Sequence, residues 1–164
     1  MILHSARVAL EPISQELARR IVDRQEQPGD NWHPEYPFAD ELVPLAALSA
    51  AEPTNSPFTM YLVRRTDDGR AIGGFGFFGP PDELGHVEFG YGLVPSARGA
   101  GLATEAVGLA LRFASAWGAR VAAADTDVRN IASQQVLLKN GFSEIRRDDA
   151  LVYYRRRFGA ERLA

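Results

Sequence analysis

Residues 98–105 (RGAGLATE) combine the residue types of an anion-binding turn. Two glycines and several small side chains leave backbone N–H groups uncovered, and an apolar helical pattern follows directly. Phosphate groups bind well at such a turn, because the free N–H donors and the positive end of the helix dipole point at the same spot. The chemistry expected here is therefore the binding of a phosphate or pyrophosphate.

Two other interpretations fit some of the same residues. Glycine allows the positive φ of a plain tight connection, which needs no ligand. Gly99-x-Gly101 followed by Asp125 also fits part of the dinucleotide-binding pattern, although Thr104 stands where a third glycine belongs. That pattern belongs to the first strand-to-helix turn of a repeating parallel sheet, whereas three antiparallel strands are expected before this turn. A nicotinamide or flavin site is thus an alternative that the order of elements disfavours.

The elements that must position this turn follow from hydrophobic periodicity and turn residues. The resulting order of strands and helices, given below, predicts a single α+β domain over residues 1–158, with a C-terminal tail at 159–164. Its sheet should be mixed and mostly antiparallel, with about six or seven strands and with helices on both faces. Strands are predicted over residues 7–12, 58–65, 71–78, 86–94, 121–124, 142–147 and 151–158, and helices over 14–27, 38–51, 102–118 and 130–140.

Composition limits the classes of ligand and the compartment. With 164 residues, 46% of them hydrophobic, the chain can bury a core. A formal net charge of −3 gives no general electrostatic basis for nucleic-acid binding. The absence of cysteine excludes disulfides, thiolate metal sites and a cysteine nucleophile. No apolar run reaches the ~18 residues of a membrane helix, and residues 1–12 lack the pattern of a signal peptide. We therefore expect a cytoplasmic protein without a membrane or nucleic-acid partner.

Two motifs together resemble those of the GNAT superfamily of acyl-CoA-dependent N-acyltransferases. Residues 98–103 (RGAGLA) are similar to its pyrophosphate loop, and residues 130–142 (NIASQQVLLKNGF) are similar to its second signature. Residues 91–95 (YGLVP) and 103–106 (ATEA) resemble the RimJ/RimL branch, which acetylates protein α-amino groups. The resemblance is strongest over residues 88–142 and extends loosely over most of the chain.

The resemblance implies acetyl-CoA as the co-substrate and no metal. The loop amides would hold the pyrophosphate, and the end of the preceding strand would face the pantetheine arm and the thioester. Two residues of the last helix would contact the pantetheine and the nucleotide. Without the resemblance, Asn130 is typical of a plain helix N-cap. The implied cofactor-binding residues are Arg98, Gly99, Ala100, Gly101, Leu102, Ala103 and Thr104 in the loop, Leu93 and Val94 in the strand, and Asn130 and Lys139 in the helix.

Acyl transfer to an amine requires that the substrate ammonium loses a proton before its nitrogen attacks the thioester. Relatives in the superfamily often carry the base on the strand that enters the cofactor site. The resemblance therefore implies Glu88 as the base, acting directly or through a water, with His86 as the second candidate. Considered without the resemblance, a glutamate in a strand is usually just solvated.

Help for the leaving thiolate is expected from a different residue than in many relatives. These carry a tyrosine seven residues after the helix asparagine, where this chain has Leu137. The branch resemblance implies Ser133 as the substitute, although a helix serine can equally bond its own backbone. Tyr153 and Tyr154 on the last strand are further candidates, since one of them should face the core and the other the cleft or solvent.

The acceptor end carries fewer signals. Trp32 and Tyr36 lie in the loop at residues 27–37, where this fold usually shapes the acceptor pocket, and Tyr153 is a third expected substrate residue. The alternative for the loop aromatics is that they simply pack the loop against the core.

The predicted function is that of an N-acetyltransferase that moves an acetyl group from acetyl-CoA to a primary amine by direct attack in a ternary complex. The acceptor is a protein or peptide N-terminal α-amine or a small amino compound, and the protein acts as a monomer or homodimer. The alternatives are a non-catalytic acyl-CoA-binding sensor on the same scaffold and a nicotinamide-dependent oxidoreductase.

Overall fold

The computed structural model describes residues 1–159, which form one eight-stranded sheet with the order β1-β2-β3-β4-β5-β6-β8-β7. All neighbouring strands are antiparallel except β5 and β6, which are parallel. The strands are β1 (Leu3–His4), β2 (Val8–Pro12), β3 (Met60–Arg65), β4 (Ala71–Phe77), β5 (His86–Leu93), β6 (Val121–Asp127), β7 (Ser143–Arg147) and β8 (Leu151–Arg157). The mixed, mostly antiparallel α+β sheet is confirmed, and the short β1 is the strand that periodicity did not reveal. Residues 160–164 of the expected tail lie outside the described residues.

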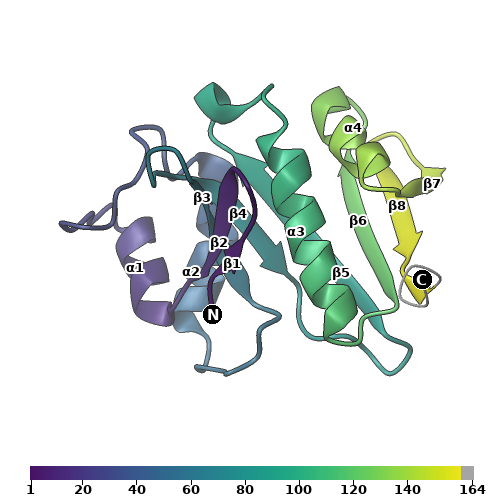
Figure 1. Cartoon of the computed structure of the whole chain (residues 1–164), viewed down its shortest axis with the longest axis horizontal. Helices are drawn as coiled ribbons and strands as arrows, with labels where there is room; N and C mark the ends of the chain where they lie inside the picture. The colour runs from purple at the N-terminus through teal and green to yellow at the C-terminus, as the bar shows by residue number, and fades with distance from the viewer. Residues whose placement is uncertain (160–164) are drawn as a thin grey trace.

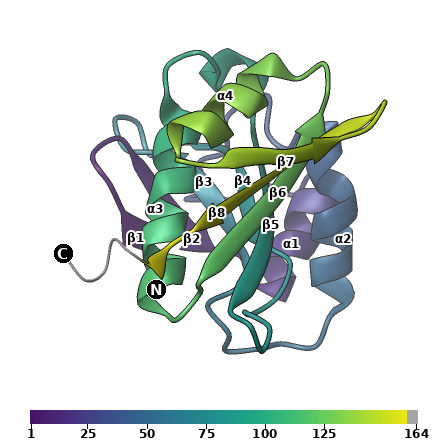
Figure 2. The same cartoon turned by 90° about the vertical axis from the view of Figure 1, so that its right-hand side faces the viewer.

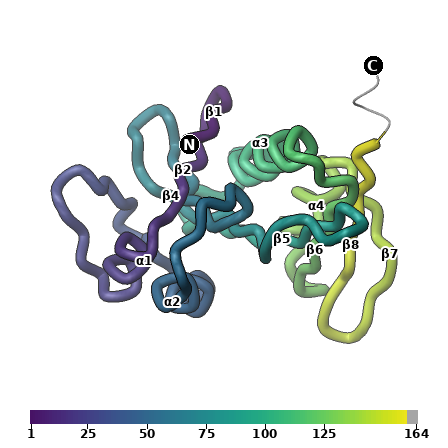
Figure 3. Tube along the Cα trace, turned by 90° about the horizontal axis from the view of Figure 1, so that it is seen from below, coloured from purple at the N-terminus to yellow at the C-terminus, as the bar shows by residue number. Residues whose placement is uncertain are grey.

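The helices lie on both faces of the sheet, as predicted (Figures 1 and 3). The pair α1 and α2 packs together on one face, while α3 crosses the other face against β1, β2 and β5, with α4 alongside it. Their bounds are α1 (Gln15–Val22), α2 (Leu42–Ala50), α3 (Leu102–Ala116) and α4 (Ile131–Lys139), and two short 3-10 turns, η1 (Ala39–Glu41) and η2 (Pro95–Ala97), precede α2 and α3.

Local chemistry explains where the helices begin and end. The Ser14 side chain caps α1 by accepting a hydrogen bond from the Leu17 amide. This helix ends at Val22, earlier than predicted, because Arg24 adopts a positive φ of 56° that no α-helix continues through. The α3 helix begins directly after Gly101, whose φ of 82° is left-handed, and buries an alanine-rich face.

The strands β5 and β6 pair over only three residues, the last pair being Glu88 with Ala123. Beyond that pair, β5 stays bonded to β4 as far as Leu93, and no strand among residues 1–159 pairs with its other side. We call Phe89–Leu93 the unpaired stretch of β5. The α4 helix, which follows β6 along the chain, lies at the end of the sheet toward which β5 and β6 run (Figure 2). The fold thus leaves backbone groups of a central strand uncovered, next to a helix.

The core on the α3 side is aromatic at this point. Phe89 stacks on Phe75 with ring centroids 5.2 Å apart and meets Phe142 edge-on at 5.7 Å. These rings fix the direction of β5 where it separates from β6. Within residues 1–159, no helix is long and apolar enough to cross a membrane.

Candidate active site

The predicted pyrophosphate loop lies at the start of α3. Gly99 and Gly101 both adopt positive φ, 86° and 82°, which turns the chain sharply before the helix. Among the described residues, none of the six consecutive backbone amides from Gly99 to Thr104 has an acceptor. Such a series of free N–H groups at a helix N-terminus is suited to bind a phosphate or pyrophosphate. Phosphate binding by this loop stays a prediction, which the free amides support.

A second set of contacts fixes this loop from the N-terminal strands. The Arg7 guanidinium donates from Nε to Glu105 Oε1 at 2.9 Å and from Nη1 to the Ala100 carbonyl at 2.8 Å. Glu105 Oε2 also accepts from the Arg7 amide and the Ser5 hydroxyl, both at 2.7 Å. Burial opposes ionisation of Glu105, but these hydrogen bonds hold its pKa below the usual value. Sequence reasoning missed Arg7, because 98 positions separate it from Glu105 and no local pattern joins them.

Arg98 faces the end of β5 rather than the open side of the loop. Its Nε donates to the Leu93 carbonyl at 2.9 Å, and its guanidinium lies 5.9 Å from the centre of the Phe38 ring. Val94 donates its amide to the Ile72 carbonyl and accepts from Ala97. Both backbone groups of Val94 therefore have partners within the chain, and the expected contact of Leu93 and Val94 with the pantetheine arm stays a prediction.

The start of α4 brings three of the relevant residues together. Asn130 is the N-cap, and its side-chain oxygen accepts from the Ser133 amide at 3.0 Å, which is the capping role that its residue type alone predicts. The Ser133 hydroxyl lies 2.7 Å from the Tyr91 hydroxyl, which comes from the unpaired stretch of β5. Leu137, one turn further along, is fully buried. No phenol therefore lies at the position where many relatives have one.

Glu88 lies at the last β5–β6 pair, with an exposed side chain that has no hydrogen bond or ion pair within the described residues. Strand alternation places Glu88 and Tyr91 on opposite faces of the sheet. Asp125 and Tyr153 share the face of Glu88 through the register with β6 and β8. His86 lies on that face too, but two residues further from the unpaired stretch. The geometry thus makes Glu88 better placed than His86 for an amine that approaches this stretch.

The remaining tyrosines have distinct surroundings. Tyr154 is buried on the α4 face, near enough to Tyr91 to influence its pKa. Tyr153 is half-buried, donates its hydroxyl to Asp148 Oδ2 at 3.2 Å, and lies under the Arg146 guanidinium. Its hydroxyl is therefore engaged at the β7–β8 turn, and its contact with a substrate stays a prediction.

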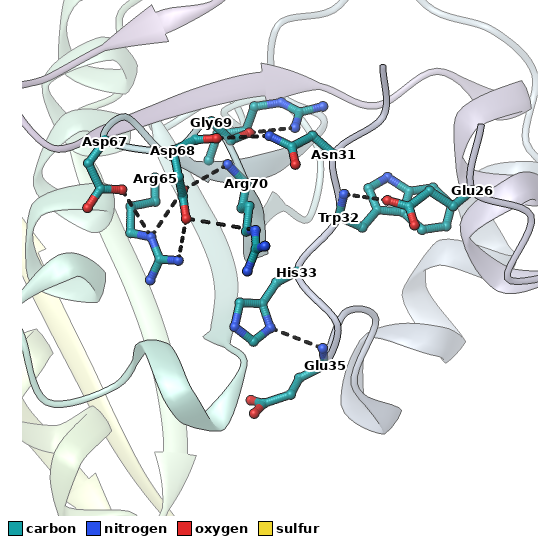
Figure 4. Close-up of polar contacts among 11 residues, drawn as sticks. Glu26, Asn31, Trp32, His33, Glu35, Arg65, Asp67, Asp68, Gly69 and Arg70 are labelled. Carbon is teal, nitrogen blue, oxygen red and sulfur yellow. Dashed lines mark hydrogen bonds and ion pairs between the residues drawn. The ribbon is translucent and has the colours of Figure 1, made fainter. Parts of the chain in front are cut away.

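The aromatic loop is attached to the hairpin turn between β3 and β4 (Figure 4). Asn31 Nδ2 donates to the Asp68 carbonyl at 2.9 Å, and the Trp32 amide donates to Glu26 Oε1 at 2.7 Å. Trp32 and Tyr36 are 8% and 5% exposed and meet edge to face, which matches the packing alternative. Their contact with an acceptor stays a prediction.

One carboxylate of this loop reaches the η2 turn that precedes α3. Glu35 accepts hydrogen bonds from the amide and the hydroxyl of Ser96, in the η2 turn just before the pyrophosphate loop. These bonds hold the pKa of Glu35 below its usual value. The loop at residues 27–37 is thereby joined to the connection that leads into α3.

Glu41, which sequence reasoning did not single out, is a buried carboxyl group beneath the same loop. It is 7% exposed, and the Tyr36 hydroxyl lies close enough to influence its pKa. A Cβ on Gly74 would lie 2.3 Å from Glu41 Oε1, so the glycine provides the room for this side chain. Burial raises the pKa of Glu41 to about 8.

Lys139 ends α4 beside an open cavity of about 570 Å³. The neighbouring Asn140 donates from Nδ2 to the Thr104 carbonyl at 3.2 Å, which joins the end of α4 to the first turn of α3. The expected role of Lys139 at the nucleotide end stays a prediction. The cavity is lined by Lys139, Asn140, Gly141, Ser143, Ile145, Arg155, Arg156 and Arg157. In residues 1–159, no group of histidine and carboxylate side chains has the arrangement of a metal site.

A model of the acetyltransferase (GNAT) domain matches residues 7–143 of this sequence. The chain therefore belongs to the GNAT acetyltransferase family, in agreement with the loop and helix motifs. A search of the curated proteins found no match.

Solved structures with the same fold include several acetyltransferases. RimL, a ribosomal α-N-protein acetyltransferase in complex with coenzyme A, is 16% identical with a TM-score of 0.71, covering 98% of this chain and 99% of that chain. A ribosomal-protein-S5-alanine acetyltransferase from Vibrio fischeri is 16% identical with a TM-score of 0.67, covering 98% of each chain. A probable GNAT acetyltransferase from Chromobacterium violaceum is 24% identical with a TM-score of 0.67, covering 95% of this chain and 85% of that chain. These likenesses establish the fold.

Proposed function

We propose that this protein transfers an acetyl group from acetyl-CoA to a primary amine, by direct attack of the amine in a ternary complex. The observation that carries the proposal is the series of six free amides, Gly99 to Thr104, at the start of α3 in a chain of the GNAT family. These donors match a pyrophosphate, and coenzyme A carries one. The coenzyme A complex of the structurally similar RimL supports the same ligand class.

The unpaired stretch of β5 supplies the site for the thioester. Successive residues of a strand present their N–H and C=O groups to opposite neighbours, so this stretch has backbone groups on its β6 side with no strand partner. An N–H group aimed at the thioester carbonyl there would stabilise the negative charge that develops on its oxygen. Asn130 and Lys139 would contact the pantetheine and the nucleotide end, respectively.

Glu88 and Ser133 act on the two sides of the reacting carbonyl. Glu88 takes a proton from the substrate ammonium on one face of the sheet, directly or through a water, which frees the nitrogen lone pair for attack. Ser133, on the α4 side, donates a hydrogen bond to the departing sulfur. The acceptor is a protein or peptide α-amine or a small amino compound, approaching from the face that Glu88 shares with Tyr153, with Trp32 and Tyr36 supporting the loop beside it. No metal takes part, and we expect a cytoplasmic monomer or homodimer.

A thermal-shift comparison of acetyl-CoA, CoA and NADPH tests the ligand class. A ligand at 100 times its Kd stabilises the folded state by about 2.7 kcal/mol. For a chain of this size each kcal/mol raises Tm by roughly 2–4 °C. We expect a clear shift with both CoA species and none with NADPH.

The outcomes separate the three interpretations of the fold. A shift with NADPH alone would support the oxidoreductase, and no shift with either CoA species would refute the proposal. A shift with CoA species but no turnover on any amine would favour the non-catalytic sensor.

A further inference from the structure

The hydroxyl groups of Tyr91 and Ser133 meet where β5 has left β6. Tyr91 Oη donates a hydrogen bond to the Ser133 carbonyl oxygen at 3.2 Å and makes a shorter contact of 2.7 Å with Ser133 Oγ, in which either hydroxyl group could be the donor. Tyr91, three residues beyond Glu88 along β5, thus places a phenol beside the first turn of α4, on the face opposite the carboxylate. Many relatives have a tyrosine on α4 where this chain has Leu137. Tyr91 brings a phenol to α4 from β5 instead.

The Tyr91 ring is held in place by its neighbours. It stacks on Phe89 with centroids 6.1 Å apart and an interplanar angle of 26°, and Phe89 stacks in turn on Phe75. The hydroxyl at the end of this ring therefore has little freedom to move away from Ser133.

The Ser133 hydroxyl does not make the bond that helix serines usually make. Such a hydroxyl commonly donates to a carbonyl in the preceding turn, but the only partner of Ser133 Oγ among the described residues is Tyr91 Oη. Burial raises the pKa of Tyr91 to about 12, with the bond to Ser133 acting in the opposite direction. The phenol thus keeps its proton near neutral pH and remains a donor.

We propose that Tyr91 is a positioning residue for acetyl transfer: its hydroxyl donates to Ser133 Oγ and turns the Ser133 hydrogen toward the departing sulfur. This inference rests on the proposed function and adds the residue through which Ser133 acts. A phenol that donates to Ser133 Oγ leaves the serine hydrogen free and increases its acidity, since consecutive hydrogen bonds polarise one another.

The bonds and protons balance without a further reactant. The nitrogen lone pair forms the N–C bond, and the electron pair of the C–S bond goes to sulfur, whose negative charge accepts the hydrogen bond from Ser133. The ammonium loses two protons, one of them through Glu88, and both reach the solvent. The released thiolate takes its proton from the solvent, and Tyr91 and Ser133 end the cycle unchanged.

A double-mutant cycle tests the coupling between the two hydroxyl groups. The variants are Tyr91→Phe, Ser133→Ala and the double variant, each assayed for kcat, for KM of the amine and for acetyl-CoA affinity. We expect Ser133→Ala to lower kcat about 100-fold, a typical contribution of a positioned proton donor. Tyr91→Phe should lower kcat about 10-fold, with unchanged acetyl-CoA affinity, because it removes one polarising hydrogen bond.

In the double variant, kcat should equal that of Ser133→Ala, because Tyr91 has no route to the sulfur once the serine hydroxyl is gone. Multiplied losses in the double variant, or an unchanged kcat in Tyr91→Phe, would overturn the inference while the transferase activity of the wild type stands. An unchanged kcat in Ser133→Ala would overturn the role of Ser133 and the inference with it. A wild-type protein with no amine-dependent turnover would instead refute the proposed function.

Tyr61→Phe is the matched control for the loss of a buried phenol hydroxyl. Tyr61 lies in β3 and donates to the Pro57 carbonyl, away from α4. We expect it to change Tm as much as Tyr91→Phe does and to leave kcat unchanged. A loss of kcat as large as that of Tyr91→Phe would show that the effect is structural.

Discussion

At the scale of single residues, Glu41 is a buried acid with a strongly raised pKa, packed close to Tyr36 of the loop at residues 27–37. Burial raises its pKa from an ordinary 4.5 to about 8, with the Tyr36 hydroxyl acting in the opposite direction and the Asp40 charge adding to the rise. Between these pH values the folded state binds a proton that the unfolded state has lost. The free energy of unfolding therefore falls as pH rises through this window, by at most about 1.4 kcal/mol per pH unit.

Glu41→Gln removes this titration and keeps the shape of the protonated acid. We expect the variant to match the wild type in Tm near pH 4.5 and to exceed it by several degrees at pH 8, because only the wild type must keep a proton or bury a charge there. Thermal unfolding at a series of pH values measures the difference. Glu52→Gln, which changes an exposed glutamate, should show no such trend. A Tm difference that is the same at every pH would contradict the raised pKa.

Single residues were predictable where their role depends on local sequence. Gly99 and Gly101 lie in the turn that their residue types predict, and Asn130 caps the helix that its residue type begins. Tyr91 was visible only as part of a motif, since nothing in its spacing indicates that its hydroxyl reaches Ser133, 42 positions later. Glu41 was missed because burial of a carboxyl group depends on the tertiary packing around Gly74.

At the scale of elements, the start of α3 is braced by the N-terminal strands through Arg7 and Glu105. Because Arg7 also donates to the Ala100 carbonyl, its guanidinium holds the loop in the shape that leaves the amides free. We expect Arg7→Ala to weaken acetyl-CoA binding about 10-fold. This loss corresponds to the lower end of the free energy that a hydrogen bond to a charged group contributes. Isothermal titration with acetyl-CoA measures this loss.

An acetyl donor without a pyrophosphate shows whether the contacts of Arg7 with Glu105 and Ala100 act on binding by the loop. S-acetyl-pantetheine lacks the pyrophosphate that we propose the loop amides bind, so Arg7→Ala should leave the KM of this acetyl donor unchanged. Arg65→Ala breaks a comparable exposed ion pair with Asp68 in the β3–β4 turn. This control should change neither the affinity for acetyl-CoA nor the KM of S-acetyl-pantetheine. Equal losses with both donors would show that Arg7 only stabilises the fold.

The type and order of the helices and strands could be predicted from the sequence, whereas the residues at which they begin and end were less predictable. All seven expected strands and four expected helices are present, since each has a clear period or turn signal. The first helix ends early at the positive φ of Arg24, and the second begins as a 3-10 turn, neither of which periodicity can express. The two-residue β1 is too short to carry a pattern, and it forms because β2 offers it an edge.

At the scale of the whole molecule, the sequence order predicted the class of fold and the position of the loop, but the site depends on pairing. The separation of β5 from β6 after Glu88 arises from the register of two strands more than 30 positions apart, which no local signal specifies. That separation divides the candidate site into a Glu88 face and a Ser133 face. The acceptor is not encoded in any motif, and Trp32 and Tyr36, which were expected to contact it, are buried in the core.

The most direct measurement is the amine-dependent release of CoA from acetyl-CoA, with acetylation of the amine followed by mass spectrometry, for the wild type and Glu88→Gln. We predict turnover by the wild type on at least one member of a panel of peptides and small amines. Glu88→Gln should bind acetyl-CoA as tightly but turn over at least about 100-fold more slowly near neutral pH, since it lacks the base. Asp125→Asn, an exposed carboxylate on the same face, should stay active. Wild-type turnover that Glu88→Gln leaves unchanged would contradict the assigned base, and the absence of any acetylated amine would contradict the transferase itself.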